Sequence, residues 1–456
     1  MPNASLLTGP IGPTLLRLAA PVLVVLTLQT LVGVAETYFV SFLGTAALAG
    51  VSLVFPLFML MTMMSNGGIG GGVSSAVARA IGAGRVRDAQ ALAMHAALIG
   101  VLFGGIFSLG VWLGGPLLFA RMGGQGDVLA NAMLYANIVF AAAIPGWIAN
   151  VFAAALRGAG NVGVPAMVTA VGSLATLALS PVLVLGWGWI PSMGVAGAGI
   201  GVAAFNVGGA VALALYMRSS RSPIRFAVVP LERRLVADIL KVGLPSAVGT
   251  VVANLTVVIT TALVGAYGAD AIAGYGLASR LDYLLIPLLF ALGTAAVVMV
   301  GRAVGAGDAA RAKRVAWTGA LISALATAAI GLTAALLPQA WMQLFSTEAA
   351  VVEVGSAYLT RVAPFYALFG AGMALYFASQ GAGKMAWPFA AGLVRLFVLL
   401  SLGGYWITRL HGSLQGLYWI VGASYFLFGA INVVAMASGL GWGEQRAPRE
   451  GLAAAR

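Results

Sequence analysis

Apolar stretches long enough to cross a lipid bilayer follow one another along almost the whole chain. A transmembrane helix needs about 20 mostly apolar residues, and breaks at charged or Gly/Pro-rich points divide this sequence into twelve such stretches. Their approximate limits are 14–42, 46–76, 91–119, 129–156, 165–187, 194–217, 238–265, 270–299, 315–338, 349–379, 386–408 and 414–437. With 61% hydrophobic and only 8% charged residues among 456, a water-soluble globular fold is excluded. We therefore predict an all-α integral membrane protein with twelve transmembrane helices.

The longest polar stretch divides these helices into two sets of six. It lies between Arg218 and Lys241 and is rich in arginine. We predict an N-lobe over 1–217, a cytoplasmic linker over 218–241, and a C-lobe over 242–456 that ends in a short cytoplasmic tail.

The two halves are copies of each other. Three short motifs recur at one and the same spacing along the chain: Arg79–Gly84 (RAIGAG) as Arg302–Gly307 (RAVGAG), Gly158–Gly160 as Gly381–Gly383, and Pro165 as Pro388. Because each half has an even number of spans, both copies sit the same way up in the membrane. Parallel repeats of this kind are a transporter architecture, with the substrate site between the halves.

The charge distribution predicts the topology. The chain has 24 Lys+Arg against 12 Asp+Glu, a formal net charge of +12. If the N-terminus is cytoplasmic, 19 of the 24 basic residues fall in inside segments and 2 in outside segments. The positive-inside rule therefore favours a multi-pass protein of the plasma membrane, the inner membrane in a bacterium, with both termini in the cytoplasm. The basic excess is a topology signal, so we expect a lipid bilayer as partner and no nucleic acid.

Residue types that carry most enzyme chemistry are scarce. Cysteine is absent, and the only histidines, His95 and His411, lie far apart in the sequence. A membrane-embedded enzyme would need clustered histidines or carboxylates, and none is evident. We expect no enzyme activity, no metal site and no cofactor.

Glu36 is the sharpest candidate for a functional residue. It lies well inside the first span, where a charge costs at least about 2.5–3.5 kcal/mol. At 100° per residue Gln29 falls on its side of the helix, with Thr30 and Thr37 adjoining, and this polar stripe should face a cavity. One interpretation is a carboxylate that alternates between a proton and another cation; the other is a carboxylate bonded permanently to a neighbouring helix.

Pro21 lies in the same helix, before Glu36. It removes a backbone hydrogen bond and predicts a bend there.

Asp282 is the other acidic residue well inside a predicted span. Tyr275 lies on its side of the eighth helix, and Arg361 and Arg395 are candidate ion-pair partners on other helices. A structural ion pair and a role in transport are equally open for Asp282.

Further polar residues are expected to line the cavity. On the seventh helix Asn254 and Thr261 share a polar face that contains no carboxylate, and Asn150 lies on the fourth helix. Such residues either bind substrate or link helices by hydrogen bonds.

The chain resembles the multidrug and toxic compound extrusion (MATE) family over about residues 10–440. The resemblance rests on Val34–Val40 (VAETYFV) with Leu43–Gly44, Leu156–Asn161 (LRGAGN) with Pro165, and Gly194–Ala198 (GVAGA). It implies a twelve-helix antiporter with two six-helix lobes that exports organic cations in exchange for protons or sodium.

Residue by residue, the resemblance places Glu36 where the family usually has aspartate. It places Thr176 and Ser180 where an asparagine and an aspartate are usual, and Asn254 and Tyr366 where one branch carries carboxylates in the C-lobe. What remains is similar to the damage-inducible branch, in which protonation of the N-lobe carboxylate drives the cycle.

The sequence thus predicts a monomeric, proton-coupled exporter of amphipathic organic cations that works by alternating access. Sodium coupling is one alternative. A flippase for lipid-linked saccharides is another, and it would be favoured if Arg280, Arg361 and Arg395 faced one central cavity.

Overall fold

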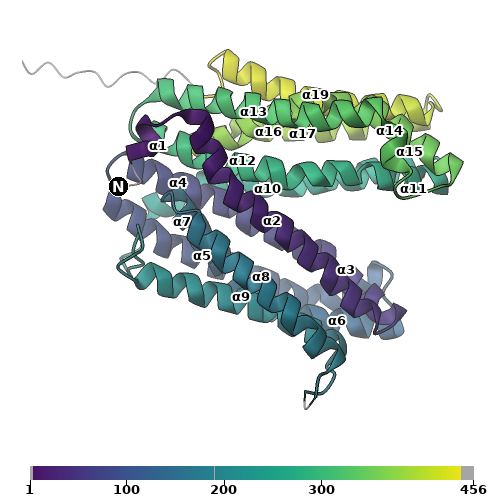
Figure 1. The fold of residues 1–456 in the computed structure, drawn as a ribbon, viewed down its shortest axis with the longest axis horizontal. Helices are drawn as coiled ribbons and strands as arrows, with labels where there is room; N and C mark the ends of the chain where they lie inside the picture. Colours follow the sequence, from purple (N-terminus) through teal and green to yellow (C-terminus); the bar gives the residue numbers. More distant parts are fainter. Residues whose placement is uncertain (1–3, 189, 443–456) are drawn as a thin grey trace, which may run out of the picture.

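The computed structural model describes residues 4–188 and 190–442, and it is built of helices (Figure 1). The predicted C-terminal tail falls almost wholly outside the described residues. Helices of the first half are α1 (Ala4–Thr8), α2 (Ile11–Ser41), α3 (Thr45–Met63), the π-helix η1 (Met64–Ile69), α4 (Gly70–Gly82), α5 (Val86–Arg121), α6 (Gly126–Ala141), α7 (Ala143–Gly158), α8 (Gly163–Leu185) and α9 (Gly194–Arg218). Residues 219–232 then lead to the second half.

The second half repeats the pattern and adds short breaks. Its helices are α10 (Arg233–Gly265), α11 (Ala269–Ala278), α12 (Arg280–Gly305), α13 (Ala309–Leu336), α14 (Pro338–Met342), α15 (Ala349–Val362), the 3₁₀ turn η2 (Ala363–Phe365), α16 (Tyr366–Ala382), α17 (Ala386–Val398), the π-helix η3 (Leu399–Gly403), α18 (Gly404–Thr408) and α19 (Leu414–Ala437). Within the described residues, eleven helical segments are long and apolar enough to cross a membrane, and α6 with α7, bent by 47°, gives the twelfth. The predicted all-α fold with twelve spans is confirmed.

The helices form two bundles that lie close at one end and diverge toward the other (Figure 1). We call the close end the linker end, because the loops 83–85, 219–232 and 306–308 lie there; the opposite, far end carries the loops 42–44 and 266–268. Each copy of the sequence repeat corresponds to one of the two bundles (Figure 1).

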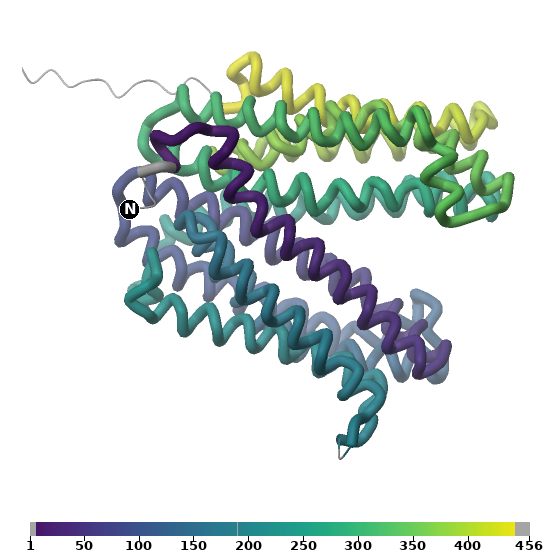
Figure 2. The backbone as a smooth tube through the Cα atoms, in the orientation of Figure 1, coloured from purple at the N-terminus to yellow at the C-terminus, as the bar shows by residue number. Residues whose placement is uncertain are grey.

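The first long helix of each half packs on both bundles. Near the linker end of α2, Leu15 and Leu18 join the apolar core of the C-lobe, whereas Val40 near its far end joins that of the N-lobe. The helix α10 does the reverse, with Ile239 in the N-lobe core and Val264 in a C-lobe core. Figure 2 shows α2, in purple, passing diagonally from one bundle to the other.

Prolines lie close to where each helix passes from one bundle to the other. Pro21 lies inside α2 and Pro245 inside α10, in matching places of the two repeats. A proline inside a helix removes one backbone hydrogen bond and lowers the resistance to bending. Both crossing helices thus lack one backbone hydrogen bond, at Pro21 and at Pro245.

Glycines let the two bundles approach at backbone distance. A methyl group added at Gly68, inside η1, would lie 2.7 Å from the Cα atom of Ala247 on α10. Methyl groups at Gly82 and Gly305 would overlap the backbone carbonyl oxygens of Arg302 and Arg79, respectively. Close backbone approach through small residues is how membrane helices gain packing energy without a hydrophobic driving force.

We expect Gly305→Ala to destabilise the protein by about 1–3 kcal/mol, because the added methyl group must displace the α4 backbone. The matched control is Gly110→Ala in α5, where nothing lies within 4 Å of the added atom; it should be neutral or stabilise by up to about 1 kcal/mol. Thermal unfolding in detergent, followed by tryptophan fluorescence, measures both. Equal melting temperatures for the two variants would contradict the close inter-lobe packing.

Candidate functional site

Glu36 lies on the far half of α2 and faces the N-lobe interior. Its Oε1 atom is buried and has no hydrogen-bond partner among the described residues. The phenol of Tyr135, on α6, lies within electrostatic range of the carboxylate. Because that buried oxygen has no permanent hydrogen bond to the described part of the chain, the carboxylate keeps the capacity to take up a proton or a cation.

More buried polar atoms lie in the helices around Glu36. The helix α2 packs against α8, and α8 packs against α9. Ser180 Oγ on α8 and Asn206 Nδ2 on α9 are buried without a hydrogen-bond partner among the described residues, while Thr176 donates to the Gly172 carbonyl of its own helix at 2.9 Å. An unsatisfied buried polar atom costs about 1–3 kcal/mol. The N-lobe interior thus contains several buried or partly buried polar side chains on neighbouring helices: Glu36, Tyr135, Thr176, Ser180 and Asn206.

The rest of the predicted polar stripe on α2 is mostly exposed. Thr30 and Thr37 are exposed, and their hydroxyls donate to the carbonyls of Leu26 and Gly33 one turn back. Gln29 is partly buried. Thr30 and Thr37 therefore do not face the buried interior of the N-lobe, where the prediction put them.

Asp282 lies in the first turn of α12, at the centre of three tyrosines. Its Oδ2 atom accepts hydrogen bonds from the hydroxyls of Tyr358 at 2.6 Å and Tyr425 at 3.3 Å. Its Oδ1 atom accepts from Tyr366. The ring of Tyr275 packs edge-on against Tyr358, with centroids 5.3 Å apart. Asp282 is therefore held by hydroxyl groups rather than by a guanidinium.

The three arginines within predicted spans have separate partners. The guanidinium of Arg395 lies 4.2 Å from the ring centroid of Tyr425, and that of Arg280 lies 5.7 Å from the ring of Phe345. Arg361 donates to Gln415 Oε1 at 2.7 Å. The three guanidinium groups therefore contact different side chains, and these contacts do not by themselves favour a flippase.

The remaining polar candidates bond locally. Asn254 is exposed on α10; its Nδ2 donates to the Thr250 carbonyl at 2.9 Å and lies 3.8 Å from Met63 Sδ in the other lobe. Thr261, also exposed, donates to the carbonyl of Val257. Asn150 Nδ2 donates to Ser65 Oγ at 2.8 Å and ties α7 to η1. In this conformation Asn150 acts as a link between helices.

Sequence reasoning singled out Tyr275 but missed Tyr135, Tyr358 and Tyr425, although the repeat contained a signal for Tyr135 and Tyr358. Tyr135 and Tyr358 occupy equivalent positions of the two repeats, and each lies beside the carboxylate that is buried in its lobe. The carboxylates themselves are not equivalent, because Glu36 comes from the first helix of its half and Asp282 from the second. Among the described residues, no group of three His, Asp or Glu side chains could hold a metal ion.

Comparisons with known proteins agree with this architecture. The MatE family model matches residues 21–182 and again 245–406, one match in each half. The probable multidrug resistance protein NorM of Thermotoga maritima is 24% identical over 87% of this chain and 83% of its own length. The FAD transporter of Shewanella oneidensis is 26% identical over 90% of this chain and 92% of its own. An outward-facing conformation of a multidrug resistance MATE family transporter of the MOP superfamily has the same fold, with a TM-score of 0.86 at 23% identity over 95% of this chain and 97% of that chain.

We expect Tyr358→Phe to destabilise the C-lobe by about 1–3 kcal/mol, because it removes the 2.6 Å donor to the Asp282 carboxylate. Tyr283→Phe is the matched control, since Tyr283 is 54% exposed and lies next to Asp282 in the sequence. Unfolding of both variants in detergent gives the comparison. A Tyr358→Phe protein as stable as the control would show that this hydrogen bond does not contribute.

Proposed function

Because the chain belongs to the MatE family of membrane transporters, we propose that it is a secondary active exporter of organic, mainly cationic amphipathic compounds, driven by protons that enter in exchange. The observation that carries the proposal is the Glu36 carboxylate, which has a buried oxygen atom that no group among the described residues satisfies. Ionisable side chains inside a membrane are rare, and most of them belong to ion pathways or proton relays. The relatives named for multidrug resistance support the substrate class.

Two states of the lobes would carry the substrate across. The distribution of Lys and Arg supports a cytoplasmic linker end, and on this proposal the described conformation, with lobes apart at the far end, would be the outward-facing one. Rocking of the lobes about Pro21 and Pro245 would close the far end and open the linker end. Rigid-body rocking of parallel repeats around a fixed site is the usual form of alternating access.

Protonation of Glu36 would couple substrate to the gradient. In the inward-facing state the ionised carboxylate attracts a cation from the cytoplasm. In the outward-facing state a proton from outside binds to a carboxylate oxygen, the charge disappears, and the cation loses its counter-charge and leaves. After the lobes return, the proton dissociates to the cytoplasm. The proton and the substrate compete for one negative charge, so each drives the release of the other.

Asp282 would supply a second coupling group. One proton exchanged for one monovalent cation moves no net charge, so the membrane voltage adds nothing and each pH unit supports only about a tenfold gradient. A second proton would add both a further pH term and the voltage. The tyrosine hydroxyls around Asp282 can rotate to accept a hydrogen bond from the protonated acid as well as to donate to the carboxylate.

Uptake into inside-out membrane vesicles under an imposed pH gradient tests the role of Glu36. We expect Glu36→Gln to lower proton-driven uptake of an organic cation at least about tenfold, because the amide cannot ionise, and Glu36→Asp to retain part of it. Glu353→Gln, an exposed acid on α15, is the matched control and should transport normally.

Three results would overturn parts of this proposal. Unaltered proton-driven uptake by Glu36→Gln excludes Glu36 as the coupling group. Uptake that responds to a sodium gradient alone replaces the proton by sodium. Uptake of a flavin dinucleotide but not of organic cations would reverse the substrate charge and align the protein with its FAD-transporting relative.

A further inference from the structure

The repeated RAIGAG and RAVGAG motifs lie where the two lobes meet, at the linker end. Arg79, in the last turn of α4, reaches into the C-lobe and donates to the Gly381 carbonyl at 3.3 Å. Its other terminal nitrogen forms an ion pair with Asp238 on α10 at 2.7 Å. Beside it, Ser75 Oγ donates to the Gln380 carbonyl at 2.5 Å and to that of Gly381 at 3.0 Å. The end of α4 is thus bonded directly to the end of α16.

Arg302, the counterpart of Arg79 in the second repeat, makes the reciprocal contact. It lies in the last turn of α12, is 2% exposed, and donates to the Ala159 carbonyl of the N-lobe at 2.6 Å. The turn that contains Ala159 and the turn that contains Gly381 are themselves the repeated pair Gly158–Gly160 and Gly381–Gly383. Each arginine at the end of the second transmembrane helix of one lobe therefore binds the turn that ends the fourth helix of the other lobe.

Glycines shape both turns around the arginine of the opposite lobe. Gly160 and Gly383 have φ of +85° and +76°, which favours glycine. A methyl group added at Gly160 would lie 3.2 Å from Arg302 Nη2, and one at Gly383 would lie 3.1 Å from Arg79 Nη1. The repeated motifs thus produce the same kind of contact between the lobes twice. We call this contact, an arginine of one lobe bound to a glycine-containing turn of the other, the inter-lobe joint.

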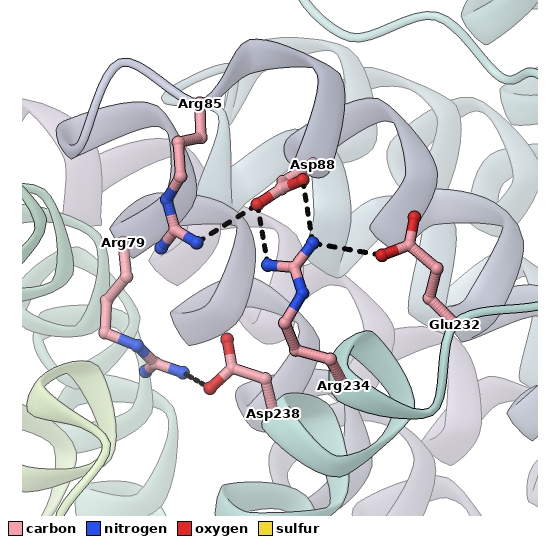
Figure 3. A network of polar contacts seen from close by, with 6 residues as sticks. All are labelled: Arg79, Arg85, Asp88, Glu232, Arg234 and Asp238. Atoms are coloured by element: carbon pink, nitrogen blue, oxygen red, sulfur yellow. Dashed lines mark hydrogen bonds and ion pairs between the residues drawn. The ribbon is translucent and has the colours of Figure 1, made fainter.

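A surface network extends the joint on the Arg79 side (Figure 3). Arg234, at the start of α10, binds both carboxylate oxygens of Asp88 on α5, at 2.9 and 3.1 Å, and also Glu232 at 3.0 Å. Arg85 binds Asp88 at 3.0 Å from within its own lobe. Asp238 and Arg234 therefore connect α10 to the N-lobe at the same end as the Arg79 contact.

We propose that Arg79 and Arg302 form the inner gate of the transporter, a pair of reciprocal latches that hold the linker end closed and must both release before it opens. The proposal rests on alternating access as the proposed function, but not on the coupling ion or on Glu36. Separation of the lobes at this end breaks the guanidinium bonds to the Gly381 and Ala159 carbonyls together, because both belong to the same interface. Hydrogen bonds from a charged donor are the stronger kind, so they bias the protein toward the closed linker end.

The absence of cysteine from the chain provides the test. Thr294→Cys puts a single thiol in the small pocket between the lobes, which is also lined by Ser74, Arg157 and Gln380. Inside-out vesicles expose the linker end to an impermeant maleimide, and the labelling rate of this thiol reports opening of the gate. Total thiol measured after denaturation in detergent corrects for the amount of folded protein.

In the Thr294→Cys background, we expect Arg79→Gln to raise the labelling rate about tenfold, the effect of about 1.4 kcal/mol on an equilibrium. Ser75→Ala, a smaller change in the same joint, should raise it less. Arg87→Gln is the matched control, because Arg87 is exposed near the same end of α5 but is outside the network of Figure 3, and it should leave the rate unchanged.

Wild-type labelling rates in both Arg79→Gln and Ser75→Ala would overturn the gate. Equal acceleration by Arg79→Gln and Arg87→Gln would overturn it too, because it would show a general effect of removing a positive charge at this surface. Labelling needs neither substrate nor gradient, so a failure of proton-driven transport leaves this result readable by itself.

Discussion

A charge inside a bilayer costs at least about 2.5–3.5 kcal/mol, and this constraint decides where the few ionisable groups of the protein lie. Asp282 is surrounded by three hydroxyl donors, and Arg395 lies against aromatic rings. Arg302 is buried against a backbone carbonyl of the other lobe. Of the two carboxylates, Glu36 is the one with a buried oxygen that has no hydrogen-bond partner among the described residues. The proposed role of Glu36 in exchanging a proton for a cation rests on this observation.

The two bundles of the internal repeat lie close together at the linker end and apart at the far end (Figure 1). The helices α2 and α10 each pack on both lobes, and the arginines of α4 and α12 bind across the interface at the linker end. The arginine contacts lie on the side that the proposed topology puts in the cytoplasm. The far halves carry the two buried carboxylates, where the bundles diverge (Figure 1). The proposed coupling site and the proposed gate thus lie in opposite halves of the same bundles.

Much of the fold could be predicted from the sequence, because only α-helices and closed β-barrels can cross a bilayer. Hydropathy located the twelve spans, and Glu36 stood out as a charge among apolar neighbours. Which side chains from different helices contact each other could not be predicted from the sequence. Tyr366 was interpreted as the loss of a C-lobe carboxylate, yet its hydroxyl binds Asp282, which comes from another helix. The RAIGAG motif was identified as a repeat, but the bonds that Arg79 makes to the far half of the sequence depend on how the lobes pack. Periodicity shows which face of a helix is polar, and only packing shows which groups meet.

Proton release on substrate binding tests the central role of Glu36 most directly. Purified protein in weakly buffered detergent solution is mixed with an organic cation, and a pH-sensitive dye counts the protons released. Competition between proton and substrate at Glu36 predicts a release that is present in the wild type and in Glu353→Gln but lost in Glu36→Gln. Substrate binding with no proton release in the wild type, or with equal release in Glu36→Gln, would contradict it.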